Sequence, residues 1–353
     1  MAAVPSYFAD FLHNIRLTKS QIDDCAAGHR VLRQRLNDDE ELSADIVDTF
    51  LQGSYKRHTA IRPTSDGERS DVDVIVVTKM DSKQWTPQQA LDRFKPFLER
   101  YYKGKYRAQG RSWGISLSYV DIDLVVTSAP SEATRAMYQT FFELDDEMLK
   151  AAGDKEWKME PLLIPDRKVG AWEKTHPLAQ ILATVRKNKE TDGNYINVVK
   201  VIKWWKNALH PSPEHPKSYP LEHLIWTVCP DSIKSVAEGV VKTFEHIRDE
   251  YSWCVKCNMK PRLPDHGVPE HDVLARVTCD EFSEFYKLAC EAAITARDAY
   301  DDEDVRSSVK KWRELFGEKF PPPPDDSGDT DDDSKGGYTP RDSPSIIGGG
   351  RFA

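Results

Sequence analysis

Two valine- and isoleucine-rich segments that each carry a pair of aspartates constrain the fold of this chain more than any other feature. Residues 71–78 read DVDVIVVT, and residues 117–127 read LSYVDIDLVVT. β-Branched residues favour strands, and alternate side chains of a strand point to the same face of its sheet. Each predicted strand therefore presents two carboxylates on one face: Asp71 with Asp73, and Asp121 with Asp123.

Carboxylates that meet at one point repel one another unless cations lie between them. For a single pair, solvated aspartates at the start of an edge strand are the ordinary explanation, but two such pairs on neighbouring strands favour a metal site. Mg²⁺ prefers carboxylate and phosphate oxygens, and two ions about 3.5–4 Å apart stabilise an in-line phosphoryl displacement. We therefore expect two Mg²⁺ ions at Asp71 and Asp73, with Asp121 and Asp123 equally spaced to supply the third ligand.

A phosphate-binding turn is expected just upstream of the first aspartate strand, at Gln52, Gly53 and Ser54. Glycine lets backbone N–H groups approach a phosphate closely, and the serine hydroxyl adds a donor. A turn of this kind beside a two-metal site indicates nucleotidyl transfer from a nucleoside triphosphate.

Basic and aromatic residues in the second half of the chain are candidates for binding the same nucleotide. The predicted helix 194–209 carries Lys200, Lys203 and Lys206, and any of the three could bind a triphosphate as a point charge. Ser218 is a candidate phosphate donor, and Tyr219 is a candidate stacking platform for a base.

The order of elements predicts an α+β fold with helices packed on a small mixed sheet. One or two amphipathic helices are expected within residues 6–36, and residues 42–51 read as helix or helix-to-strand. Thr86-Pro87 is a helix start that places a helix in the crossover between the two strands.

The second half of the chain is predicted to be mostly helical and to end at Phe320, because consecutive prolines follow. The expected units are a core over residues 1–176, a helical lobe over 177–320 and an acidic, disordered tail over 321–353. The expected helices span residues 177–188, 194–209, 218–228, 231–248, 280–299 and 302–316.

Composition excludes several classes of protein. A formal net charge of −9 argues against a protein that coats long nucleic acid, because phosphate binding depends on Lys and Arg. No segment approaches the roughly 20 apolar residues that cross a bilayer, and the N-terminus does not read as a secretory signal. The six cysteines do not form a disulfide-type pattern, so we expect a protein of the reducing cytoplasm. Cys254-x-x-Cys257 resembles half of a zinc site, but the spacing of the residues that follow is irregular for zinc.

Five longer strings extend these motifs along the chain: QGSYKRHTAIRP (52–63), SDVDVIVV (70–77), KVIKWWK (200–206), KSYPLEHLI (217–225) and KKWRELFGEKFP (310–321). Through these strings the chain resembles the bacterial CD-NTases, the DncV-like relatives of cyclic GMP-AMP synthase within the DNA-polymerase-β-like nucleotidyltransferases. The resemblance implies a nucleotidyltransferase core and a helical lobe, with ATP or GTP entering the cleft between them. It also implies synthesis of a cyclic di- or trinucleotide second messenger for antiphage signalling, with release of pyrophosphate.

The resemblance also assigns roles to individual residues. Its metal aspartates fall on Asp71, Asp73 and Asp121, with Asp121 holding the ion that activates the attacking ribose hydroxyl. Its phosphate-binding residues fall on the Gly53-Ser54 turn and on Lys200 and Ser218, and Tyr219 takes the base-stacking position.

The ending GGGRFA is similar to that of family members whose terminal carboxylate is attached to other molecules by a ubiquitin-like conjugation system. The resemblance implies an E1/E2-type partner that acts on Ala353, and a tail without a role is the alternative. For the whole chain, the rival hypotheses are a nucleotidyltransferase that modifies RNA ends or protein, and a scaffold that has lost catalysis.

Overall fold

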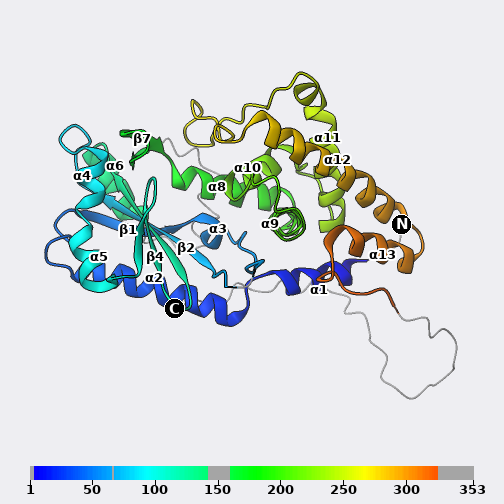
Figure 1. Ribbon diagram of the computed structural model, residues 1–353, viewed down its shortest axis with the longest axis horizontal. Coiled ribbons are helices and arrows are strands. Elements are labelled where there is room, and N and C mark those ends of the chain that lie inside the picture. The colour runs from blue at the N-terminus through cyan, green and yellow to red at the C-terminus, as the bar shows by residue number, and fades with distance from the viewer. Residues whose placement is uncertain (1–3, 66, 142–159, 325–353) are drawn as a thin grey trace, which may run out of the picture.

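The computed structural model describes residues 4–65, 67–141 and 160–324. Two lobes lie side by side in Figure 1, one built around a β-sheet and the other built of helices. The predicted α+β class is confirmed. None of the helices in the described ranges combines the length and the apolar character of a membrane-spanning segment.

The described part of the first lobe contains a seven-stranded sheet in which the two aspartate strands are central neighbours. The order is β1-β2-β5-β4-β3, with β6 joined to β5 and β7 to β6. The pair β2 and β5 is parallel, and Asp71 lies opposite Asp121 and Asp73 opposite Asp123. The strands are β1 (Ile46–Gln52), β2 (Asp71–Thr78), β3 (Tyr106–Ala108), β4 (Trp113–Ser116), β5 (Asp121–Ser128), β6 (Leu162–Asp166) and β7 (Ala171–Thr175).

The helix predicted in the crossover between the aspartate strands is present. Thr86 caps α4 (Pro87–Asp92) in a capping box with Gln89, and α5 (Lys95–Tyr102) follows it. These two helices and α2 (Lys19–Asp38) contribute apolar side chains to a core shared with the sheet. The short helices α3 (Gly53–Lys56) and α6 (Glu132–Phe141) complete this lobe.

Two segments differ from the sequence-based prediction. The segment 42–51 was expected to be helical at least at its start, but turns occupy its first residues and β1 begins at Ile46, where pairing with β2 fixes an extended backbone. The strand expected over 117–127 begins only at Asp121, because Leu117 N donates to Val120 O and closes the turn between β4 and β5.

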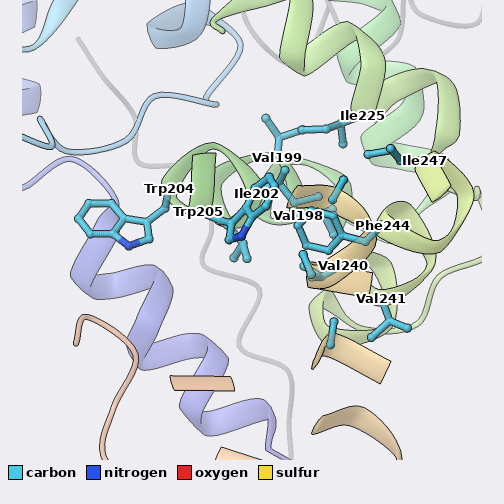
Figure 2. Packing of buried hydrophobic residues seen from close by; sticks show 14 of the residues in the cluster. Val198, Val199, Ile202, Trp204, Trp205, Ile225, Val240, Val241, Phe244 and Ile247 are labelled. Atoms are coloured by element: carbon cyan, nitrogen blue, oxygen red, sulfur yellow. The ribbon is translucent and has the colours of Figure 1, made fainter. Parts of the chain in front are cut away.

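The second lobe packs its helices around a continuous apolar core. Figure 2 shows Val198, Ile202 and Trp205 of one segment against Val240 and Phe244 of another. The helices are α8 (Pro177–Glu190), α9 (Tyr195–Trp204), the π-helical turn η1 (Trp205–Leu209), α10 (Tyr219–Val228), α11 (Val236–Lys256), α12 (Cys279–Asp301) and α13 (Val305–Phe316).

The N-terminal helix α1 (Pro5–Ile15) packs in the helical lobe, although the expected division at residue 176 groups it with the sheet. Phe8 meets Trp312 edge to face at 5.0 Å between ring centroids, and Phe11 stacks on Phe316 at 5.1 Å. The first and last helices therefore close one core, and α1 carries the chain from there to the sheet (Figure 1).

Candidate active site

The parallel register of β2 and β5 brings three carboxylates together at the N-terminal ends of the two strands. Asp71, Asp73 and Asp123 each offer an oxygen, and these oxygens all lie within 4.8 Å of one another. The carboxylate of Asp121 is held instead by Arg69, whose Nη2 lies 2.9 Å from its Oδ1. The structure thus brings Asp123 into the group in place of Asp121, on which the resemblance had placed the third ligand.

Burial and nearby carboxylates disfavour the charged forms of these three aspartates. Desolvation, together with repulsion from Asp73 and Asp123, raises the pKa of Asp71 to about 8. Desolvation and the charge of Asp73 raise the pKa of Asp123 to about 6. A hard divalent cation such as Mg²⁺ would relieve the repulsion between these carboxylates, and their oxygens are the ligands that it prefers.

Gly53 brings the predicted phosphate turn directly onto the carboxylate cluster. Its φ of +74° is a conformation that favours glycine, and a Cβ built there would lie 1.7 Å from Asp73 Oδ2. The next residue, Ser54, accepts hydrogen bonds at its carbonyl from Thr59 N and Ala60 N at 2.9 and 3.1 Å. No other residue type fits at position 53 while Asp73 stays in place.

A cavity of about 120 Å³ adjoins the cluster and lies between the two lobes. Ser54 and Asp71 line it from the first lobe, and Lys203 and Ser218 line it from the second. The structure therefore places two predicted phosphate donors, one metal-site aspartate and a lysine around one space.

Lys203, rather than Lys200, reaches this cavity. Lys200 lies one turn earlier on α9 and is half-buried, and desolvation and the nearby charges of Arg16 and Lys203 lower its pKa to about 8. Lys206 is directed elsewhere and donates to the carbonyls of His210 and Pro213. Of the three lysines considered from the sequence, the geometry favours Lys203 as the triphosphate ligand.

A buried carboxylate that sequence reasoning missed holds Lys203 in place. Glu222 of α10 accepts from Lys203 Nζ at 2.8 Å, from Arg57 Nε at 3.2 Å and from Thr59 Oγ1 at 2.8 Å. Lys203 Nζ also donates to the carbonyl of Thr59 at 3.1 Å. Desolvation acts to raise the pKa of Glu222, but Lys203 and Arg57 outweigh it and bring that pKa to about 2. This network joins the segment after the phosphate turn to helices α9 and α10 of the second lobe.

The predicted stacking residue Tyr219 lies at the start of α10 and is held on two sides. Its hydroxyl donates to Asp265 Oδ2 at 3.0 Å, and the Arg57 guanidinium lies 5.3 Å from its ring centroid. Gln52 joins the same polar chain, because its amide donates to Gln180 and Gln180 donates to Asp265. Tyr219 also lines a second cavity of about 430 Å³, a volume typical of small-molecule sites. The remaining predicted residue, Ala353, lies outside the described part of the chain.

Comparisons with known proteins identify the family of this chain. Residues 1–133 match the family described as the Second Messenger Oligonucleotide or Dinucleotide Synthetase domain. A probable cyclic AMP-AMP-GMP nucleotide synthase of Salmonella paratyphi B is 42% identical over 349 residues, covering 90% of this chain and 91% of that protein. The cyclic AMP-AMP-GMP synthase of Enterobacter hormaechei is 41% identical, covering 89% and 91%.

The fold matches solved structures at low sequence identity. The Vibrio cholerae cyclic AMP-GMP synthase DncV superimposes with a TM-score of 0.65 at 13% identity, covering 90% of this chain and 97% of that one. The Escherichia coli MS115-1 protein CdnC, solved with ATP, gives 0.62 at 17% identity, covering 90% and 99%. With relatives above 40% identity along nearly its whole length, the chain belongs to the bacterial CD-NTases, the nucleotidyltransferases that synthesise cyclic oligonucleotides.

Proposed function

We propose that this enzyme joins two AMP units and one GMP unit into cyclic AMP-AMP-GMP, using ATP and GTP in the cytoplasm and releasing pyrophosphate at each step. The observation that carries the choice of product is the 42% identity over 90% of the chain to a probable cyclic AMP-AMP-GMP synthase. A relative named cyclic AMP-AMP-AMP synthase, from Acinetobacter, is less similar, at 31% identity over 317 residues.

We assign the metal site to Asp71, Asp73 and Asp123, with Asp123 in the role that the resemblance gave to Asp121. Two Mg²⁺ ions bound there supply charge stabilisation for the attacking and leaving oxygens of phosphoryl transfer. Proximity of the three carboxylate oxygens supports this assignment, and so does the pairing of Asp121 with Arg69, which already neutralises that carboxylate.

The cavity beside the cluster is our proposed site for the triphosphate. Ser54 and Ser218 offer hydroxyl donors from opposite lobes, and Lys203 offers a positive charge for the pyrophosphate that departs. Glu222 and Arg57 hold the lysine and the phosphate turn at a fixed separation, so that both lobes contact the same phosphates. Tyr219, which lines the larger cavity, is our candidate for base stacking.

Product analysis tests the proposal. Purified protein is incubated with ATP, GTP, CTP, UTP and Mg²⁺, then treated with phosphatase and examined by mass spectrometry. We expect a phosphatase-resistant ring of two AMP and one GMP, absent with Asp73→Asn and unchanged with Asp298→Asn on the exposed surface of α12. A ring without guanine would refute the product, and a label found only in RNA or protein would refute cyclic nucleotide synthesis.

A further inference from the structure

The side chain of Gln109, in the loop between β3 and β4, contacts the metal-site carboxylate Asp123 directly. Its Nε2 donates to Asp123 Oδ1 at 2.9 Å. At its other end, Gln109 Oε1 accepts from Ser112 Oγ at 2.6 Å. The orientation of this amide follows from chemistry, because a carboxylate can only accept and so faces the NH₂ group, which leaves the oxygen for the serine hydroxyl.

Space for this contact depends on Gly114. In the antiparallel pairing of β4 with β5, Gly114 lies directly opposite Asp123. A Cβ at Gly114 would lie 2.5 Å from Gln109 Nε2, closer than such atoms approach. The bare backbone of residue 114 therefore leaves the gap through which the glutamine amide reaches the aspartate.

The loop that carries Gln109 is braced from a distant strand. Arg167, which follows β6, donates through Nη1 to the carbonyls of Gln109 and Ser112, the latter at 2.9 Å. Its guanidinium also lies 4.3 Å from the ring centroid of Trp113. These contacts fix both the backbone and the side chain of Gln109. The hydrogen bond from Gln109 to Asp123 is therefore preformed.

Asp121 and Asp123 differ in the charge of the group that donates a hydrogen bond to each carboxylate. Asp121 faces a guanidinium, which competes with any cation for the carboxylate. Asp123 faces a neutral amide, which fixes the plane of the carboxylate and leaves its full negative charge for a metal. Hydrogen-bond partners of metal-ligating carboxylates commonly contribute 10–100-fold in metal affinity.

We propose that Gln109 is a positioning residue that holds Asp123 in the orientation needed to bind a divalent cation, and that Gly114 is required because it admits the glutamine. The inference rests on the proposed assignment of Asp123 to the metal site. It adds two residues on β4 and its preceding loop to the determinants of metal affinity.

Binding of Mn²⁺ to the nucleotide-free protein, followed by electron paramagnetic resonance, tests the proposal without any catalytic turnover. We expect Gln109→Leu to weaken Mn²⁺ binding by about 10–100-fold. The KM for ATP at saturating metal should change by less than about threefold, since the lysine and serine ligands are untouched. The matched control is Gln88→Leu, which removes the same kind of contact, an exposed amide that donates to Asp92 at 2.7 Å.

A second variant keeps the test decisive if Gln109→Leu fails to fold. Gly114→Ala displaces only the far end of a flexible side chain, so the fold should survive while the contact with Asp123 is lost. We expect the same weakening of Mn²⁺ binding. Unchanged Mn²⁺ affinity in a folded variant, while Asp123→Asn abolishes binding, would overturn the role of Gln109. Unchanged affinity in Asp123→Asn would instead overturn the metal site itself.

Discussion

Replacing Glu222 by glutamine removes the carboxylate with which both Arg57 and Lys203 are paired. The side chains of these three residues are each less than a tenth exposed. Arg57 and Lys203 therefore stay buried without their hydrogen-bonded carboxylate, and Asp73 is the remaining negative charge near them. Shape and volume barely change, so any loss of stability reports the electrostatics of this network rather than packing.

The ion pair and the lowered pKa of Glu222 both indicate the size of the loss. Breaking a buried ion pair by removing one partner costs about 3–5 kcal/mol. A carboxyl whose pKa is held at about 2, where 4.5 is the ordinary value, contributes about 3 kcal/mol to stability at neutral pH. Because this pKa is lowered on folding, the contribution is present above pH 4.5 and is lost as pH falls toward 2.

Urea denaturation of wild type and Glu222→Gln measures this loss, with Glu314→Gln on an exposed position of α13 as the matched control. We expect a decrease of about 3–5 kcal/mol at pH 7 for Glu222→Gln and less than about 0.5 kcal/mol for the control. The difference between wild type and variant should shrink by about half at pH 3. A loss below about 1 kcal/mol, or a gap that is the same at both pH values, contradicts the reasoning.

Two further predictions concern the metal site and the lysines. Desolvation and repulsion raise the pKa of Asp71 to about 8, so its ionisation destabilises the metal-free fold progressively as pH rises from about 4 through 8. Asp71→Asn should therefore raise the melting temperature in chelator at pH 8 but not at pH 4.5, and should abolish stabilisation by Mn²⁺; a lower melting temperature at pH 8 contradicts this. Lys203→Met should raise the KM for ATP at least about tenfold, and Lys200→Met less than about threefold, in steady-state assays; the reverse order would place the triphosphate on Lys200.

Much of the first lobe was predictable because its signals are local. The Val/Ile runs around Asp71 and Asp121, and the Thr86-Pro87 helix start, each depend on a few neighbouring residues, and the structure has a strand or a helix at each. The choice between Asp121 and Asp123 was not predictable from spacing, because both point to one face of β5. Arg69 and Gln109, which lie outside that strand, distinguish them.

Long-range contacts account for the other differences. Lys200 and Lys203 lie on neighbouring turns of one helix, so the sequence does not distinguish them. Glu222, on a separate helix, accepts a hydrogen bond from Lys203 and holds it at the cavity. The apolar face of α1 does not indicate which part of the chain it packs against. In the structure, Phe11 of this face stacks on Phe316, about 300 residues later in the sequence. Contacts of this kind become visible only once the chain is folded.

The most direct test is a crystal structure of the protein with Mn²⁺ and a non-hydrolysable ATP analogue, with the ions located by their anomalous scattering. We expect anomalous peaks bounded by Asp71, Asp73 and Asp123, the triphosphate between Ser54 and Lys203, and Asp121 still paired with Arg69. Peaks on Asp121 with Asp123 unliganded, or ions bound away from all three carboxylates, would contradict the proposed site.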